Sequence, residues 1–382
     1  MTGLIVSEAC SGSLRAMTPV ATPADLRPLT SLRFIAAAWV VLFTAWPHLD
    51  VSFIPNAVTK GYLGVETFFV LSGFILSHVY LEAFGEKRYG HGGFLWARIA
   101  RVYPMHLLTL FAMMALGIAA GVAGLSVSES LTDWRSLPAH LTMTHAWGFA
   151  PSAAFNHPSW SISAEWFAYL TFPAYAFVAW RLRDRPWIAV LLTAVLALML
   201  YAAFPLWSGF SLTEATFRWG ALRIVPCFAL GCALYLVRRK APIRHGGRVA
   251  LIAALGMIVS ASLLWWDAIT VLFAGALILG LGSMDNHRAG VLASPVGVYL
   301  GEISYSIYMV CAPVILVVTN LAAKLLGADS DRLHIIVWLG VVAAIPVAAM
   351  GSYHLVERPA RQALRRIKIK NDKPAPAAEA RT

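Results

Sequence analysis

The chain has 382 residues, of which 59 % are hydrophobic and only 13 % are Asp, Glu, Lys or Arg. This composition excludes an ordinary soluble protein, whose surface needs about twice that share of charged residues. The net charge of +11 would suit a nucleic-acid-binding protein, but the basic residues stand in short clusters between apolar stretches. Such clusters are typical of a membrane protein whose basic loops face the cytoplasm. We therefore expect the lipid bilayer, and no nucleic acid, as a partner.

The first 28 residues lack the basic start, apolar run and cleavage site, in that order, of a secretory signal peptide. We interpret residues 1–28 as a cytoplasmic segment that precedes the first span. The cysteines at positions 10, 227, 232 and 311 show no CxxC spacing. We expect neither a metal site nor a disulfide framework.

Apolar stretches long enough to cross about 30 Å of hydrocarbon recur along the chain. They predict an all-α, polytopic membrane bundle with about ten transmembrane helices. The expected spans are residues 29–46, 62–81, 103–125, 166–180, 187–204, 221–237, 249–264, 268–281, 298–321 and 333–355. Placing both termini in the cytoplasm puts most of the basic residues on that side of the membrane.

The first span carries polar residues that are costly in hydrocarbon and are therefore candidates for function. Arg33 lies near its start, and Thr44 follows eleven residues later. Three helical turns separate them, so they share a face, while His48 lies one turn further on, displaced by roughly 40°. Alternatively, Arg33 snorkels to the cytoplasmic interface and His48 lies among the outer headgroups.

The next two spans carry further candidates. The segment YLGVETFFVLSGFIL contains Glu66, Ser72 and Gly73, and the glycine predicts the close approach of another helix. The segment RIARVYP, just before the third span, contains Arg98 and Arg101, which are neighbours on a helix face. Two guanidinium groups suit a phosphate or diphosphate, although the pair could serve only as a topology signal.

The longest outer segment, residues 126–165, exceeds a simple connector and is our candidate for a binding loop. Its end, NHPSWSISAEW, brings Trp160, Ser161, Ser163 and Glu165 to the membrane border. The tryptophan could belong to an interfacial belt or form a platform for a sugar ring.

The ninth span and the C-terminal segment carry the remaining features of the sequence. Glu302, Ser304 and Tyr305 form a polar group in the ninth span, where a buried glutamate needs a partner. Residues 367–382 mix Pro, Ala and charged residues without periodicity, which predicts a disordered cytoplasmic tail.

Five segments occur together in the order and spacing of one known family. They are YLGVETFFVLSGFIL, RIARVYP, WSISAE, LGEISYSIYM and LVERPAR. In them the chain resembles the acyltransferase type 3 family of integral membrane acyltransferases, which includes O-antigen O-acetylases. The similarity extends over residues 29–366, which we expect to be the membrane domain.

The resemblance implies a multi-pass enzyme of the bacterial inner membrane, with both termini in the cytoplasm. Such an enzyme transfers an acyl group, usually acetyl from acetyl-CoA, to a hydroxyl of a cell-surface or exported glycan or a lipid-linked sugar. Acyl-CoA is then a donor substrate, and no bound cofactor or metal is expected.

The family motifs also imply roles for individual residues. Arg33 opens the Arg-x10-His motif, and Arg98 and Arg101 are the pair at the acyl-CoA end. Ser72 and Glu165 belong to segments that line a central pore. Beyond the family motifs, we expect Glu165 and Trp160 to organise the outer acceptor site, and Ser161 and Ser163 to bind substrate.

Two histidines of the family pattern are absent. Thr44 stands where the Arg-x10-His motif ends, and Cys311 stands where relatives commonly carry histidine in the ninth span. A threonine hydroxyl has no useful basicity near neutral pH. Three interpretations stay open: His48 is a displaced base, Glu165 or His157 is the base, or the chain is a catalytically silent or transporter-like relative.

Overall fold

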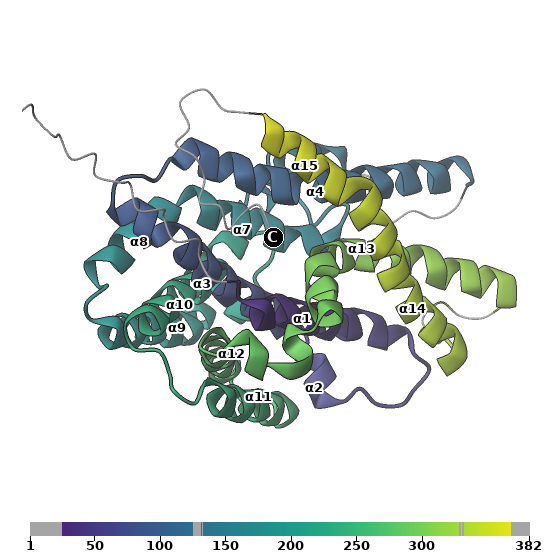
Figure 1. The fold of residues 1–382 in the computed structure, drawn as a ribbon. Helices are drawn as coiled ribbons and strands as arrows, with labels where there is room; N and C mark the ends of the chain where they lie inside the picture. Colours follow the sequence, from purple (N-terminus) through teal and green to yellow (C-terminus); the bar gives the residue numbers. More distant parts are fainter. Residues whose placement is uncertain (1–24, 125–130, 132, 328–329, 331, 368–382) are drawn as a thin grey trace, which may run out of the picture.

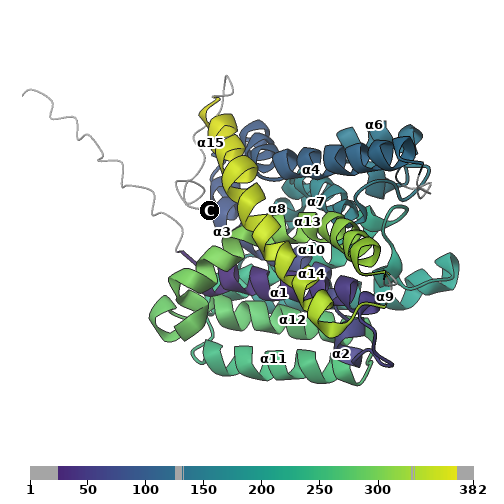
Figure 2. The same ribbon diagram turned by 90° about the vertical axis from the view of Figure 1, so that its right-hand side faces the viewer.

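The computed structural model describes residues 25–124, 131, 133–327, 330 and 332–367. Their regular structure consists of helices (Figures 1 and 2), and an isolated β-bridge joins Leu49 to Leu333 between two loops. The prediction of an all-α helical bundle is confirmed. Residues 1–24 and 368–382, where the cytoplasmic segment and the disordered tail were predicted, lie outside the described residues.

Seven helices in the described part of the chain are long and apolar enough to cross a membrane. These helices are α1 (Arg27–Ala45), α3 (Leu63–Gly85), α4 (His91–Val122), α9 (Pro186–Ser208), α10 (Gly220–Lys240), α13 (Pro295–Leu326) and α14 (Ile335–Ser352). Each overlaps a predicted span. The chain is therefore a multi-pass membrane protein.

The other three predicted spans have a different form. Two are shorter apolar helices, α11 (Gly246–Ser262) and α12 (Asp267–Gly282). The span predicted at 166–180 is replaced by α7 (Trp160–Leu170) and α8 (Phe172–Arg181), which are separated at Thr171. Pro173 explains the break, because a proline lacks the N–H that would continue the hydrogen-bond ladder of α7.

Short elements connect these helices. They are η1 (Trp46–His48), α2 (Asn56–Thr59), η2 (Trp134–Ser136), α6 (Leu137–Leu141), η3 (His145–Trp147), η4 (His157–Ser159), η5 (Leu212–Glu214), η6 (Asn286–Arg288) and η7 (Gly290–Ala293). Four of them, η2, α6, η3 and η4, belong to the predicted outer loop. That loop is therefore folded over much of its described length.

Helices α3 and α10 pack closely at the centre of the molecule. A Cβ added to Gly73 would lie 2.1 Å from the carbonyl oxygen of Phe228, and one added to Gly231 would lie 2.0 Å from that of Val70. A side chain at either position would force the helices apart, as at other small-residue helix contacts in membranes. The close approach predicted for Gly73 is confirmed.

Helix α4 begins at His91 rather than near residue 103. Arg98 and Arg101 therefore lie within the helix and not in a loop before it, and Arg98 is only 8 % exposed. The apolar content of the sequence marks the start of a span poorly here, because arginines inside a membrane helix are tolerated where they face the protein interior.

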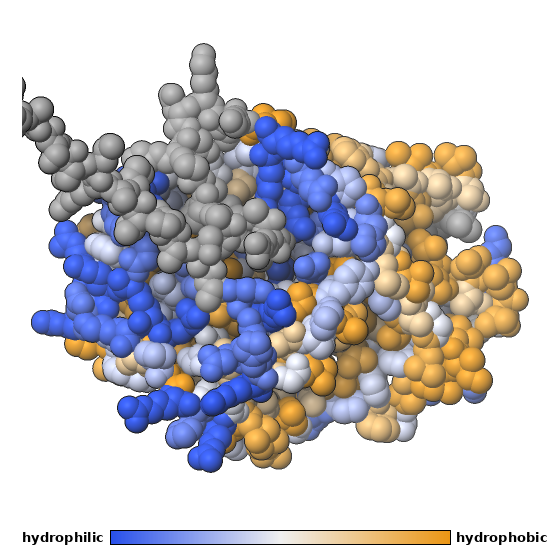
Figure 3. Space-filling model, viewed as in Figure 1, coloured by the Kyte–Doolittle hydropathy of each residue, from blue (hydrophilic) through white to orange (hydrophobic). Residues whose placement is uncertain are grey.

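The C-terminal helices form one continuous, bent helical segment. Helix α14 continues through a π-helical turn, η8 (Tyr353–Glu357), into α15 (Arg358–Arg366), which lies over α4 (Figures 1 and 2). In the space-filling view, hydrophilic residues gather on the left and across the middle, over α8 and α15 (Figure 3). Hydrophobic residues cover the right-hand end, towards which α4, α13 and α14 extend.

Candidate active site

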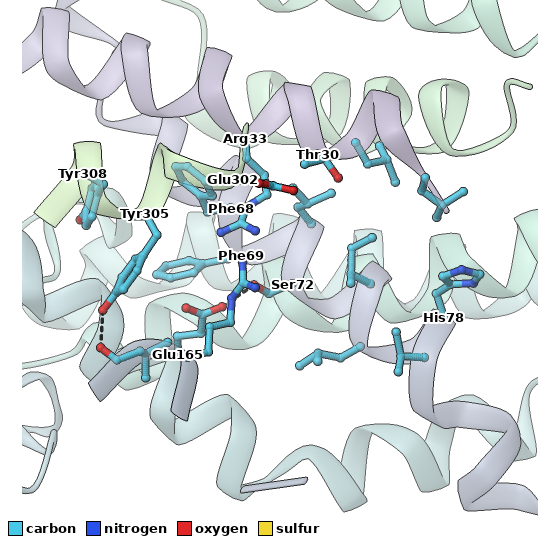
Figure 4. A pocket seen from close by; sticks show the side chains of 18 of the residues that line it. Thr30, Arg33, Phe68, Phe69, Ser72, His78, Glu165, Glu302, Tyr305 and Tyr308 are labelled. Atoms are coloured by element: carbon cyan, nitrogen blue, oxygen red, sulfur yellow. Dashed lines mark hydrogen bonds between the residues drawn. The ribbon is translucent and has the colours of Figure 1, made fainter. Parts of the chain in front are cut away.

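A cavity of about 950 Å³ lies between α1, α3, α4, α7 and α13. Figure 4 shows His78 at one end of it and Tyr305 and Tyr308 at the other, with Arg33, Ser72 and Glu165 between them. Asp25 and Arg27, at the start of α1, also line it. The cavity therefore extends from the basic end of α1 into the bundle.

A polar cluster occupies the middle of the cavity. Arg33 from α1, Arg98 and Arg101 from α4, and Ser72 from α3 all line it together with Glu165 from α7. The Ser72 hydroxyl donates a hydrogen bond to the Glu165 carboxylate. The sequence predicted each of these five residues for the site, and the fold brings them to one cavity from four helices.

The far end of the cavity is lined by hydroxyl groups. The Tyr308 hydroxyl donates to the Pro158 carbonyl at 2.9 Å and accepts from Ser161 at 2.8 Å. The Tyr305 hydroxyl donates to the Val102 carbonyl at 2.6 Å. Tyr308 is thus tied to η4 and the start of α7, and Tyr305 is tied to α4.

Glu302 lines the same cavity from α13. Its carboxylate accepts a hydrogen bond of 3.3 Å from the Tyr353 hydroxyl, which comes from the π-helical turn η8. The partner that the sequence analysis required for this glutamate is therefore Tyr353.

Glu357 and Arg361 were missed by the sequence analysis, although both belong to the quoted LVERPAR segment. Glu357 is 1 % exposed and accepts a hydrogen bond of 2.6 Å from Ser306. Arg33 and Arg101 both have Glu357 and Arg361 among their charged neighbours. The sequence signal that could have identified Glu357 is a glutamate between an apolar run and a basic segment. The π-helical turn that contains it is also a feature frequent at functional sites.

Trp160 does not form an exposed platform for a sugar, because its side chain is only 4 % exposed. The Arg223 guanidinium lies 4.4 Å from the centre of its ring, a cation–π contact. Arg223 also forms a buried ion pair of 2.5 Å with Glu66. Trp160 thus covers a buried charge pair within the bundle.

Ser163 is likewise fully buried and lies outside the cavity lining. Its hydroxyl accepts the backbone N–H of Ala146 at 2.9 Å. This bond ties η3 of the outer loop to α7. In the WSISAE segment, Ser161 and Glu165 face the cavity, whereas Trp160 and Ser163 hold the surrounding structure.

Thr44 and Cys311, the two positions where the family pattern has histidine, lie against each other. Their side chains are neighbours between α1 and α13, and the Thr44 hydroxyl donates to the Val40 carbonyl at 2.9 Å. Cys311 is buried, and neither residue is part of the cavity lining. The two departures from the pattern thus form one small, uncharged contact.

His48 lies beyond the end of α1, in η1, and its ring is hydrogen-bonded at 3.2 Å to the carbonyl of Ser330. It is not part of the cavity lining. His157, in η4, is an exposed residue whose ring contacts Phe217. The structure therefore does not bring either histidine to the cluster around Glu165.

Three histidines that the sequence analysis passed over are stacked where α4, α6 and η3 meet. His140 and His145 have ring centroids 4.0 Å apart, and the ring of His106 lies 5.7 Å from that of His145. Burial lowers the pKa of His140 to about 3 and the pKa of His145 well below its usual value. At neutral pH the two rings are therefore uncharged and pack as aromatic groups.

Comparison with known proteins decides the family. A family model described as an acyltransferase domain matches residues 29–356. The chain belongs to the acyltransferase type 3 family. It is 30 % identical over 318 residues to "Acyltransferase MdmB" from Streptomyces mycarofaciens, covering 75 % of this chain and 78 % of that protein.

A second relative of this acyltransferase matches a shorter part of the chain. "Protein 2 in picA locus" from Rhizobium radiobacter is 39 % identical over 97 residues, which are 25 % of this chain and 48 % of that protein. No solved structure matches the chain. Membership of the family makes the protein a membrane acyltransferase, with an acyl donor and an acceptor as its substrates.

Proposed function

We propose that this acyltransferase moves an acyl group, acetyl in the simplest case, from acyl-CoA to a hydroxyl of a cell-envelope or exported glycan. The bacterial inner membrane would be its location, with both termini in the cytoplasm. The observation that carries the proposal is the cavity itself, which combines three arginines with a carboxylate that is held in place by a serine.

The donor half of the proposal rests on Arg98 and Arg101, which line the cavity from α4. Planar guanidinium groups bind phosphate oxygens through paired, charge-assisted hydrogen bonds. The pantetheine arm of the donor would then follow the apolar part of the cavity, which Phe68 and Ile75 line. This arrangement would bring the thioester towards the hydroxyl-lined end.

The transfer half of the proposal rests on Glu165. Of the candidates for the missing histidine base, Glu165 lines the cavity, whereas His48 and His157 do not. In the proposed step, the acceptor hydroxyl oxygen attacks the thioester carbonyl carbon while Glu165 takes the hydroxyl proton. The C–S bond breaks, the CoA thiolate leaves, and the proton passes from Glu165 to that thiolate.

The tetrahedral intermediate of this step carries a negative oxygen that needs stabilisation. Arg33 lies in the same cavity as Glu165 and has it as a charged neighbour. We assign the guanidinium of Arg33 to this oxygen, and the hydroxyl of Ser72 to the orientation of Glu165.

The first test measures CoA binding and the transfer of radiolabelled acetyl groups by the full chain in nanodiscs, with an envelope polysaccharide extract as acceptor. We expect Arg101→Gln to weaken CoA binding about tenfold to hundredfold, as loss of charged hydrogen bonds does. The control is Glu86→Gln, because Glu86 is exposed and paired with Arg88 away from the cavity. Unchanged CoA binding by Arg101→Gln would contradict the donor assignment.

A second candidate function is a catalytically silent or transporter-like protein. The neighbouring residues Thr44 and Cys311 favour it, because a threonine and a cysteine stand where the family pattern has histidine. Such a protein would bind acyl-CoA and never release labelled acetyl from it. The binding and transfer measurements together separate the two functions.

A further inference from the structure

Helix α15 presents two arginines to the body of the protein. Arg361 and Arg365 are one helical turn apart on the same face, and both are partly buried. Arg358 and Arg366 on the same helix are exposed. The helix is fastened to α4 by a hydrogen bond of 2.9 Å from the Trp96 indole to the carbonyl of Leu364.

The arginines of α15 join those of the cavity in one electrostatic cluster. Arg101 has Arg33, Arg98 and Arg361 as charged neighbours, and Arg365 has Arg98 and Arg361. Helices α1, α4 and α15 therefore bring five guanidinium groups together at one side of the cavity. These helices are far apart in the sequence, so the sequence alone did not predict that their arginines lie together.

The carboxylates nearby neutralise the cluster only in part. The carboxylates among its neighbours are Glu165 and Glu357, with Glu302 also lining the cavity, so the guanidinium groups outnumber them. Repulsion among partly buried like charges is costly where water is scarce. A polyanion with several phosphate groups would relieve it, because phosphate oxygens match the geometry of guanidinium groups.

We propose that α15 is part of the donor site, and that Arg361 and Arg365 supply positive charge that holds the phosphate groups of acyl-CoA at Arg98 and Arg101. This inference rests on the proposed function. The π-helical turn η8 sets the rotation of α15, because its Glu357 is fixed inside the bundle by Ser306. Arg361 and Arg365 act as positioning residues, since Arg98 and Arg101 line the cavity and they do not.

The experiment measures CoA binding by the full chain in nanodiscs of neutral lipid, at low and at moderate salt. The double variant Arg361→Gln/Arg365→Gln should bind CoA at least about tenfold more weakly and lose part of the salt dependence. The charge-retaining double variant Arg361→Lys/Arg365→Lys should stay within about threefold of the wild type. The matched control is Arg358→Gln/Arg366→Gln, which removes two exposed arginines of the same helix and should bind as the wild type does.

Three outcomes would overturn the inference. The first is wild-type affinity in the glutamine double variant while Arg101→Gln has lost binding, which leaves the proposed function intact. The second is equal loss in the lysine and glutamine variants with a lowered melting temperature, which indicates a structural role. The third is CoA binding by the glutamine double variant that is weakened only in nanodiscs of anionic lipid and not in those of neutral lipid, which assigns the cluster to lipid headgroups. A wild-type chain that binds no CoA would instead refute the proposed function, and this inference with it.

Discussion

Thr44 is the residue that most separates this chain from the family pattern, and its surroundings show why the position needs no histidine for folding. Its side chain lies beside Cys311, and its hydroxyl donates to the Val40 carbonyl. The absence of two histidines was visible in the sequence. The contact between Thr44 and Cys311 was not visible, because it depends on how α1 packs against α13.

His48 provides a prediction at the same scale. We expect His48→Ala to transfer acetyl within about twofold of the wild type, because its ring binds the Ser330 carbonyl outside the cavity. Melting temperature is measured beside transfer, since loss of one hydrogen bond costs about 1 kcal/mol. Abolished transfer by a stably folded His48→Ala would instead restore the displaced-histidine hypothesis.

At the scale of elements, the sequence indicated most spans but not their ends or interruptions. Apolar length predicted the long helices, since a membrane requires it. It failed at α4, where Arg98 and Arg101 lie within the helix, and at α7 and α8, where Pro173 divides a single apolar stretch. The site residues Ser72, Arg101 and Glu165 were predictable from motifs, whereas Arg361 needed the packing of α15 on α4.

The contact between α3 and α10 gives a prediction for packing. Gly231→Ala should lower stability by about 1–3 kcal/mol, because its Cβ would meet the Val70 carbonyl at 2.0 Å. Gly340→Ala on α14 is the control, since an added Cβ there has nothing within 4 Å among the described atoms. Alanine favours a helix over glycine, so the control should melt at or above the wild-type temperature. Equal melting of the two variants would refute the close contact.

The stacked histidines predict a pH dependence for the outer loop. The pKa of His140 is about 3 in the folded protein and about 6.5 in an unfolded chain, so the unfolded loop binds more protons below pH 6.5. Stability contributed by the neutral ring is therefore lost as the pH falls, by about 2 kcal/mol at pH 5. Hydrogen-exchange protection of residues 133–159 should fall from pH 7 to pH 5, relative to α10.

The control for that experiment is His140→Phe, which keeps an aromatic ring in the stack and removes the titrating group. Its loss of protection between pH 7 and pH 5 should be smaller than that of the wild type. The same loss in both chains would show that the stack does not cause the pH dependence.

At the scale of the whole molecule, the helices enclose a cavity that has arginines in its middle and tyrosine hydroxyl groups at one end. This polarity suits a substrate with a phosphate-bearing end and an acyl end. Composition and charge clusters predicted a membrane protein, and motif order predicted its family. The resemblance implied a central pore, but not its volume or its full lining, because its walls come from helices distant in sequence.

The most direct test of acyl transfer at this cavity compares wild type with Glu165→Gln, using labelled acetyl-CoA, an envelope polysaccharide extract and proteoliposomes. The amide keeps the size of the side chain but cannot take a proton. A general base contributes about 10²–10⁴ in rate, so we predict at least a hundredfold loss of acetyl transfer with CoA binding retained. Wild-type transfer by Glu165→Gln would contradict the proposed catalytic role of this cavity.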